Sequence, residues 1–252
     1  MSALVETFLH DDGIHELRLS RPPVNALHPA LCMAIGDAIA GALAQDAKGL
    51  VLSGGPKAFT AGLDVPHLLT LDGTALRDAW EGFFLAARAL AESPVPVAAA
   101  LNGHAPAGGC VLALCCDYRV MATGPYAIGL NETQVGLVAP EGIQHLMRRV
   151  VGTQRAERLL VAGEMIDAQR ALEIGLVDEL ADIDHVPVRA REWLQGLLSL
   201  PRKPMLATRA ISRADVIAAL QPERIGLDRF VAAWNDPDTQ AGLRALVAKL
   251  GK

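Results

Sequence analysis

The stretch PVPVAAALNGHAPAGGCVLALCCDYRV, residues 94–120, decides the fold. Its first part, residues 95–101, is a short apolar run between prolines and Asn102-Gly103, which predicts a buried strand. A loop of small residues follows over 102–109. From Gly108 onward every residue to Cys116 is apolar or small, as in a helix that is buried on all sides. The stretch therefore predicts a strand, a tight loop and a core helix in succession.

Such a loop can receive negative charge. The first N–H groups of a helix lack partners within it, and the helix dipole adds partial positive charge there. The small residues Ala107 to Gly109 would let a ligand atom come close, so the N–H of Gly108 is a candidate oxyanion donor. A second loop, Ala61-Gly62-Leu63, also precedes a predicted helix, and the N–H of Leu63 is its candidate partner. The alternative interpretation is that these glycines serve packing only.

The composition excludes several classes of function. The 252 residues carry a formal net charge of −5 without a basic run, which disfavours nucleic-acid binding. None of the four cysteines forms a CxxC pair, and three lie in the apolar run, so they indicate core residues in a reducing compartment. The seven histidines show no HExxH or HxH spacing, so we predict no metal site.

The sequence also predicts a cytoplasmic protein that does not span a membrane. Three prolines and the polar pair Asn102 and His104 interrupt the uncharged run between Ser93 and Cys116, whereas a spanning helix needs about 20 continuous apolar residues. The N-terminus, MSALVETFLHDDG, lacks both a secretory apolar segment and an Arg-rich transit pattern.

The rest of the chain alternates strands and helices. We expect two strands over residues 4–20 around the turn Asp11-Asp12-Gly13, and a strand over 50–53. Helices are expected from His28-Pro29 to about residue 48, over 75–92, from about 144 to 150, over 154–162 and over 167–173. The last sixty residues are predicted to be helical. Their apolar positions, which include Ile225, Phe230 and Trp234, exceed what one helix needs, so they should cover another surface of this chain or of a neighbour.

Glu132 lies among apolar and small residues in AIGLNETQVGLVAPEG, residues 127–142. A carboxylate in apolar surroundings is costly unless it has a task. The alternative, an exposed loop glutamate, is the more frequent case.

Taken together, these motifs resemble the enoyl-CoA hydratase/isomerase (crotonase) superfamily over most of the chain. The matching segments are RPPVNAL at 21–27, KAFTAGLDV at 57–65, NGHAPAGGCVLALCCDYRV at 102–120 and GLVDEL at 175–180. Within the superfamily, GLNETQVGLVAP at 129–140 is most similar to the mitochondrial-type Δ3,Δ2-enoyl-CoA isomerases, also called dodecenoyl-CoA isomerases.

The resemblance implies an α/β fold with two parts. Residues 1–190 would form a spiral of ββα units that carries an acyl-CoA site. Residues 191–252 would form a helical C-terminal region used to assemble a homotrimer or a pair of trimers. The thioester oxygen of the substrate would be held by the N–H groups of Leu63 and Gly108, the same pair that the two loops suggest.

The resemblance also assigns the chemistry. The single catalytic glutamate of the isomerases falls on Glu132, whereas hydratases use two, and the second would fall where this chain has Val111. Valine cannot move a proton, so the substitution favours an isomerase in unsaturated fatty acid β-oxidation. Glu132 would carry a proton from C2 to C4 of a 3-enoyl-CoA, with its pKa raised by the apolar residues Leu130, Val135 and Val138. The sequence departs from the isomerases at Glu141-Gly142, where bulky apolar residues are usual. Glu141 could be a second acid/base group, a residue at the pocket rim or simply solvated, and we favour the rim.

By the same resemblance, no metal or redox cofactor is required, and coenzyme A is part of the substrate. The residues expected to bind substrate are Val24, Ala26, Ala61, Gly62, Leu63, Asp64, Val65, Gly108 and Asn131. The alternative role for Asp64 is that of a helix N-cap and no more. Two alternatives stay open, namely hydration by Glu141 with Glu132, and a catalytically silent acyl-CoA-binding subunit. A nucleic-acid role ranks last.

Overall fold

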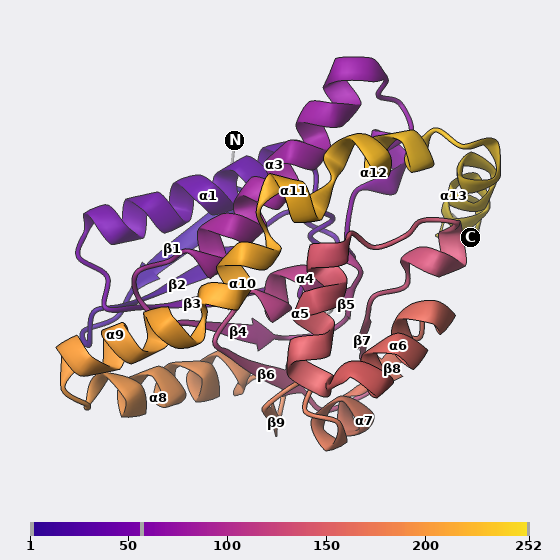
Figure 1. Cartoon of the computed structure of the whole chain (residues 1–252). Coiled ribbons are helices and arrows are strands. Elements are labelled where there is room, and N and C mark those ends of the chain that lie inside the picture. Colours follow the sequence, from indigo (N-terminus) through magenta and orange to yellow (C-terminus); the bar gives the residue numbers. More distant parts are fainter. Residues whose placement is uncertain (1–2, 56–57, 251–252) are drawn as a thin grey trace.

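The computed structural model describes residues 3–55 and 58–250, so Lys57 of the second motif lies outside the described residues. Residues 94–120 form the predicted strand, loop and helix (Figure 1). The strand is β4 (Val97–Leu101), the loop contains the short strand β5 (Ala105–Pro106), and the helix is α4 (Gly108–Leu114). Every residue of α4 is buried, as expected from a run without a polar face.

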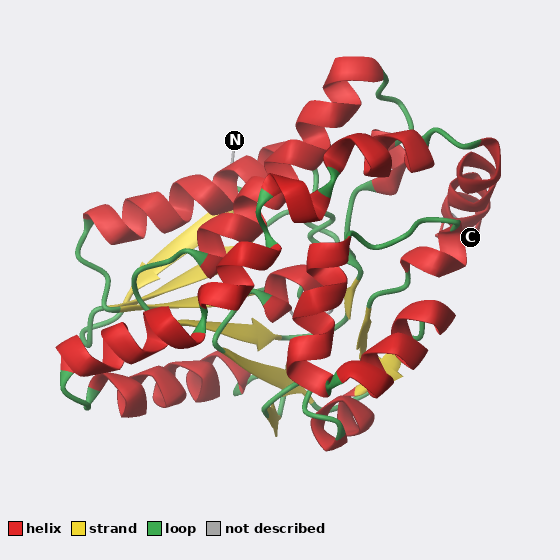
Figure 2. Ribbon diagram, viewed as in Figure 1, coloured by secondary structure: helices red, strands yellow, loops and turns green. Residues whose placement is uncertain are grey.

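The main sheet has six strands in the order β1-β2-β3-β4-β6-β9. Its strands, besides β4, are β1 (Val5–Leu9), β2 (Ile14–Leu19), β3 (Gly49–Ser53), β6 (Tyr118–Ala122) and β9 (Glu179–Ala181). The hairpin β1–β2 is antiparallel, and the other pairs are parallel. Helices cover both faces of this sheet (Figure 2), which is why β4 can be an unbroken apolar run rather than an alternating one.

A second sheet contains β5, β7 (Ala127–Gly129) and β8 (Ile166–Asp167). Two isolated parallel bridges, Leu27 with Leu63 and Ala58 with His104, resemble short pieces of further strands. A long strand, a short strand and a helix thus recur along the chain, as in β4, β5 and α4. The expected fold of ββα turns is confirmed, and this repetition brings the loops that precede the helices to one place.

The helices of the first half of the chain lie close to where the sequence predicts them. They are α1 (Pro29–Ala44), which packs against β1 and β2, α2 (Val65–Leu68) and α3 (Gly73–Ala91). In the second half, α8 (Val186–Leu198) packs against β3, β4 and β6, and it begins before the predicted helical region. Between them lie the 3₁₀ helix η1 (Glu132–Val135) and the helices α5 (Glu141–Val151), α6 (Thr153–Ala162) and α7 (Ala168–Glu173). α5 begins three residues before the expected Gln144, and α1 ends at Ala44 rather than near residue 48.

The C-terminal helices are α9 (Arg202–Ser212), α10 (Ala214–Ala219), α11 (Pro222–Ile225), α12 (Leu227–Trp234) and α13 (Pro237–Leu250). The predicted boundary between residues 190 and 191 falls inside α8, whose Ala190 and Leu194 pack against the sheet with Val51 and Ala98. The role of the C-terminal region in assembly stays a prediction. Within the described residues, no helix is long and apolar enough to cross a membrane.

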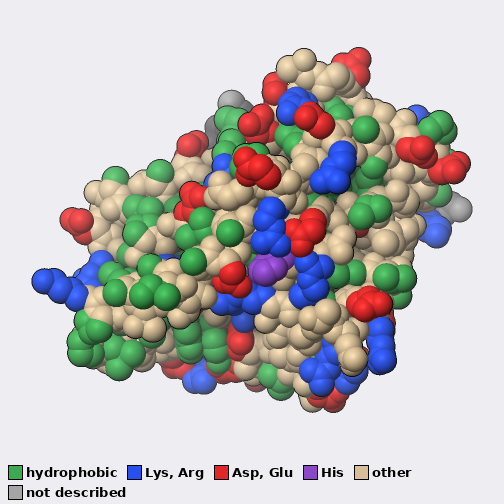
Figure 3. All heavy atoms as spheres, in the orientation of Figure 1, with side chains coloured by type: hydrophobic (Ala, Val, Ile, Leu, Met, Phe, Trp, Pro, Cys, Tyr) green, Lys and Arg blue, Asp and Glu red, His purple; other side chains and the backbone are tan. Residues whose placement is uncertain are grey.

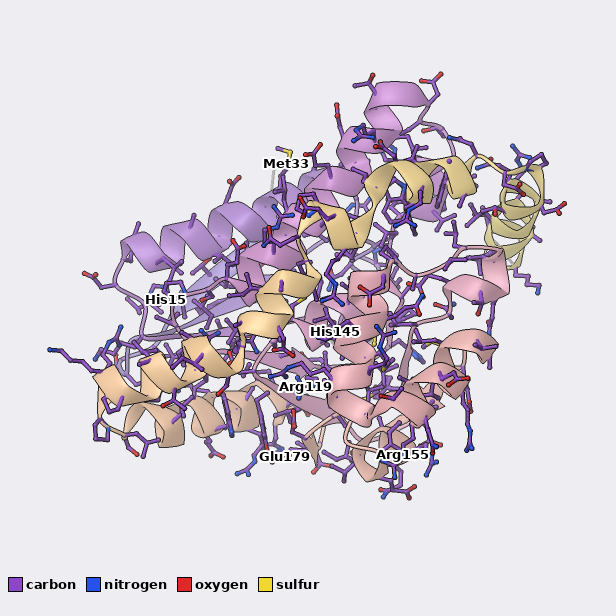
Figure 4. The ribbon with its side chains drawn as sticks, viewed as in Figure 1. His15, Met33, Arg119, His145, Arg155 and Glu179 are labelled. Atoms are coloured by element: carbon purple, nitrogen blue, oxygen red, sulfur yellow. The ribbon has the colours of Figure 1, made fainter. Side chains whose placement is uncertain are left out.

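Buried ion pairs fasten α9 to the core. Asp117 accepts hydrogen bonds of 2.8 Å from both Nε and Nη2 of Arg209 and lies 3.3 Å from Arg213. Arg213 also donates to the carbonyl of Cys115, 2.6 Å away, at the C-terminal end of α4. Nearby, Arg119 of β6 pairs with Asp178 at 2.6 Å (Figure 4). These contacts anchor the end of α4 that lies opposite its first N–H groups.

Candidate active site

The two loops singled out in the sequence lie against each other. A Cβ atom added to Gly62 would lie 3.0 Å from the carbonyl oxygen of Pro106 and 3.8 Å from the backbone nitrogen of Gly108. A Cβ atom added to Gly108 would lie 2.4 Å from Cδ2 of Leu63. Gly62 also has φ +80°, a conformation that favours glycine. Glycine at these two positions is therefore what allows the loops to touch.

The candidate N–H group of each loop has no acceptor within the described part of the chain. In the first loop, the N–H of Ala61 donates to Val24 O (2.9 Å) and that of Asp64 to Leu27 O (3.3 Å). In the second loop, the N–H of Ala107 donates to Gly129 O (2.8 Å). Among residues 3–55 and 58–250, no acceptor binds the N–H of Leu63 or of Gly108. Two unpaired donors from separate loops are the arrangement that an oxyanion requires.

A cavity of about 280 Å³ opens beside these donors. Its lining is almost entirely apolar. The lining residues are Ala61, Leu63, Val65, Trp80, Phe83, Phe84, Pro106, Ala107, Gly108, Val111, Asn131, Glu132, Val135, Leu137, Pro140, Ile143, Phe230, Trp234, Leu243 and Leu246. Glu132 carries the one carboxyl group in this described lining.

Glu132 opens the 3₁₀ helix η1, which ends at Gly136 with φ +78°. The turn is fixed from outside, because Thr239 at the start of α13 donates a 2.8 Å hydrogen bond to the carbonyl of Gly136. The Oε2 atom of Glu132 is buried, and no partner for it lies within the described part of the chain. Burial raises the pKa of this carboxyl from its ordinary 4.5 to about 7.

The apolar surroundings expected for Glu132 are only partly those predicted. Val135 lines the cavity and Leu130 is buried. Val138 is 64% exposed and does not line this cavity, but it lines a second pocket together with Leu130 and Glu132. Further apolar contacts come from Leu137, which follows the 3₁₀ helix, and from Ile143 of α5.

The structure separates Glu141 from the cavity. Its carboxylate accepts hydrogen bonds from Arg224 (2.7 and 2.9 Å) and from Arg148 (2.6 Å), and these arginines lower its pKa. The pair of Arg149 and Asp215 likewise links α5 to α10, and Figure 3 shows acidic and basic side chains gathered near the centre of the face drawn there. Val111, at the position of the second hydratase glutamate, is buried and lines the cavity. A role for Glu141 as the second acid/base group therefore has no geometric support.

Of the predicted binding residues, Ala61, Leu63, Val65, Gly108 and Asn131 line the cavity with Glu132. Asp64 does not. It caps α2 by accepting from the N–H of His67, as predicted, and it also pairs with Arg21 at 2.8 Å. Val24 and Ala26 lie outside the cavity and contribute carbonyls to the loop, which accept from Ala61 and Arg21 respectively. A role for Val24, Ala26 and Asp64 in binding coenzyme A stays a prediction.

Sequence reasoning missed the aromatic residues that line the cavity. Trp80, Phe83 and Phe84 lie on the helix predicted over residues 75–92, which the sequence did not link to the site. Phe230 and Trp234 of α12 complete this group. The spacing of the three aromatic residues on α3, in a chain with 4% aromatics, was the one available signal.

Comparison with known proteins gives a consistent result. The family model described as enoyl-CoA hydratase/isomerase matches residues 10–250. The chain is 32% identical over 243 residues to the mitochondrial enoyl-CoA delta isomerase 1 of Mus musculus, covering 94% of this chain and 84% of that protein. It is 34% identical over 231 residues to a probable enoyl-CoA hydratase of Mycolicibacterium paratuberculosis, covering 88% and 89%. The crystal structure of human mitochondrial delta3-delta2-enoyl-CoA isomerase superposes with a TM-score of 0.92 at 27% identity, over 98% of both chains.

Proposed function

Because this chain belongs to the enoyl-CoA hydratase/isomerase family, we propose that it is a Δ3,Δ2-enoyl-CoA isomerase. The observation that carries the proposal is the single carboxyl group in the described lining of the cavity. Glu132 faces an apolar cavity beside two unpaired N–H groups, and Val111 occupies the position where a hydratase would have its second glutamate. One base suffices to move a double bond, whereas adding water across it is helped by two.

The first step is removal of a proton from C2 of a 3-enoyl thioester. That proton is acidic because it lies between the thioester carbonyl and the double bond. Its loss gives a dienolate with most of its charge on the thioester oxygen. The N–H groups of Leu63 and Gly108 would bind this charged oxygen more strongly than the neutral carbonyl, which lowers the barrier.

Glu132 takes the C2 proton and returns it to C4, which leaves the double bond between C2 and C3. A carboxylate with pKa about 7 is a stronger base than an ordinary glutamate with pKa 4.5, and it is still substantially ionised near neutral pH. The apolar walls support this role, because they keep water away from the intermediate.

The remaining parts of the proposal concern the surroundings of this step. The backbone of Val24, Ala26 and Ala61 to Val65 would hold coenzyme A, and Asn131 would contact the acyl group. The reaction needs no metal or redox cofactor. We place the enzyme in the β-oxidation of unsaturated fatty acids in the cytoplasm, as a homotrimer or a pair of trimers.

The test is incubation of the purified protein with a 3-enoyl-CoA, followed by ultraviolet absorbance of the conjugated product and by its mass. We expect the absorbance to rise without a change in mass, and kcat/KM to increase with pH through about 7 as Glu132 ionises. Glu132→Gln should lower the rate by a factor of about 10²–10⁴. The matched control, Glu141→Gln, should keep activity near the wild-type level. Equal rates for wild type and Glu132→Gln would remove Glu132 from its role.

Hydration is the second candidate, favoured by the similarity to a probable hydratase at 34% identity. It is tested with a 2-enoyl-CoA substrate in the same assay. Rapid loss of absorbance with a gain of one water in mass would make the protein a hydratase despite Val111. Binding of both thioesters without turnover would leave a silent acyl-CoA-binding subunit.

A further inference from the structure

The turn η1, which carries Glu132, is held from two sides. On the first side, Thr133 and Gln134 donate from their side chains to the carbonyls of Leu160 and Gly163, at 3.3 and 2.7 Å. These carbonyls lie at the C-terminal end of α6, where a helix needs hydrogen-bond donors from outside. The first half of η1 is therefore fastened to a helix that follows it closely in the chain.

The second side is α13, drawn in yellow in Figure 1. The hydroxyl of Thr239, a residue only 3% exposed, donates a 2.8 Å hydrogen bond to the carbonyl of Gly136, which ends η1. A Cβ atom added to Gly242 would lie 3.0 Å from the carbonyl oxygen of Val135, so the helix and the turn approach as closely as a glycine allows. Within the described residues, the Thr239 hydroxyl makes the one hydrogen bond between α13 and this turn.

The same helix reaches the other half of the site. α13 packs against α2, which begins two residues after the donor Leu63. Leu243 and Leu246 of α13 line the cavity that Leu63 and Glu132 also line. α13 therefore contacts both the turn that carries the base and the helix that follows the first oxyanion donor.

Glu132 depends on its turn for orientation. Its Oε2 atom is buried without a hydrogen-bond partner among the described residues, so this atom gives the carboxyl group no anchor of its own. The backbone of η1 sets where the carboxyl group lies instead. A displacement of about 1 Å can cost a catalytic group a factor of about 10² in rate. A contact that fixes η1 is therefore a contact that fixes the base.

We propose that Thr239 is a positioning residue, whose hydroxyl holds η1 against α13 and so keeps the carboxylate of Glu132 in line with C2 and C4 of the substrate. Thr239 does not line the cavity, and it acts through the backbone of Gly136, which lies 103 residues away in the sequence. The inference rests on the proposed function, because the reaction is what depends on the position of the base.

The hydroxyl is tested by Thr239→Val, which removes it and keeps the shape of the side chain. In the isomerisation assay we expect kcat to fall about 10- to 100-fold while KM changes less than about twofold, because the substrate still binds but the base is misplaced. Thr239→Ser, which keeps the hydroxyl, should restore most of kcat.

The matched control is Ser93→Ala. The hydroxyl of Ser93 also donates a 2.8 Å hydrogen bond to a backbone carbonyl, that of Val95, and the residue is equally buried at 3% exposure. Ser93 lies outside the cavity lining. Its replacement should lower the midpoint of urea unfolding to a similar degree as Thr239→Val and keep the wild-type kcat, which separates positioning from stability.

The close approach of helix and turn is tested separately by Gly242→Ala. Alanine favours a helix over glycine, so a loss of activity could not come from a weaker α13. The added Cβ would press on the carbonyl of Val135, and kcat should fall at least about tenfold. Gly36→Ala, in open space on α1, is the control and should keep kcat. Wild-type kcat in folded Thr239→Val and Gly242→Ala, or a Thr239→Ser variant as slow as Thr239→Val, would overturn the proposal.

Amide hydrogen exchange of residues 132–137 measures the same contact without catalysis. Thr239→Val should speed this exchange about three- to tenfold, because one hydrogen bond no longer holds the turn, and Ser93→Ala should not. If the wild-type protein does not isomerise but this difference in exchange is found, the proposed function is rejected and the hold of Thr239 on the turn is kept. Isomerisation at equal rates by wild type and Thr239→Val would reject the positioning role and keep the proposed function.

Discussion

Replacement of Glu132 by glutamine should make the protein more stable at alkaline pH while it removes the proposed catalytic base. The Oε2 atom of Glu132 is buried without a partner among the described residues, and burial raises the pKa of the carboxyl to about 7. In the unfolded chain the same carboxyl would titrate near its ordinary 4.5. The folded protein therefore keeps a proton that the unfolded chain has already released, and glutamine has no such proton to lose.

The sign follows from proton linkage. Between pH 4.5 and about 7 the folded state binds more protons than the unfolded state, so stability falls as pH rises through this window. At 1.36 kcal/mol for each pKa unit, the difference between 4.5 and about 7 corresponds to at most about 3 kcal/mol of lost stability above pH 7. At pH 5 the same relation gives a loss below about 1 kcal/mol. The advantage of Glu132→Gln should thus be small at pH 5 and large at pH 8.

The assay is urea unfolding of wild type and variant at pH 5 and pH 8, followed by circular dichroism. The matched control is Glu141→Gln, a glutamate nine residues away whose pKa is lowered by Arg224 and Arg148. Because the ionised form of Glu141 is the favoured one, its replacement should destabilise the protein at pH 8, by at most about 1 kcal/mol for an exposed pair. If Glu132→Gln were no more stable than wild type at pH 8, the carboxyl would not be desolvated as described.

Three further predictions concern other parts of the molecule. Gly108→Ala should fold yet lose isomerisation by a factor of about 10²–10³, because its Cβ would collide with Leu63 of the other loop and displace an oxyanion donor. The control is Gly82→Ala, in open space on α3, which should keep full activity in the same assay. Arg209→Met should destabilise the protein by about 3 kcal/mol in thermal unfolding, because it leaves Asp117 buried with a weaker partner; a change within error would show that the pair is solvated. His15→Phe should stabilise the protein more at pH 5 than at pH 8. Burial lowers the pKa of His15 (Figure 4), so as pH falls below 6.5 the histidine of the unfolded chain takes up a proton before that of the folded protein does. An equal gain in stability at both pH values would contradict this.

Much of the local structure could be predicted because its causes are local. Residues 97–101 form a strand because they are apolar between turn-forming neighbours, and Asp64 caps α2 because its carboxylate reaches an N–H three residues ahead. The two small-residue loops could be paired in advance, since only loops without bulky side chains let backbones approach. Val111 could be recognised as a departure from the hydratase pattern because that pattern requires a glutamate at this position.

The properties of the site depend on contacts between remote segments. The apolar neighbours of Glu132 in the sequence suggested a raised pKa, but the extent of its burial also depends on residues far along the chain, such as Phe230 and Trp234, that line the same cavity. Glu141 is a glutamate like Glu132 and lies nine residues further along the chain, yet Arg224 and Arg148 hold its carboxylate on the outer surface.

The sequence by itself determined most of the elements and singled out the two small-residue loops, since these follow from side-chain size, polarity and spacing within a few residues, whereas the proposed role of Glu132 as the single base came from the family resemblance. Only the tertiary structure decided how deep the cavity is and how strongly Glu132 is desolvated. Those quantities arise when α12 brings Phe230 and Trp234 against Trp80, and α13 fixes the turn that carries Glu132. Burial is a sum over neighbours that the chain brings together only when it folds, and no local pattern encodes which neighbours those will be.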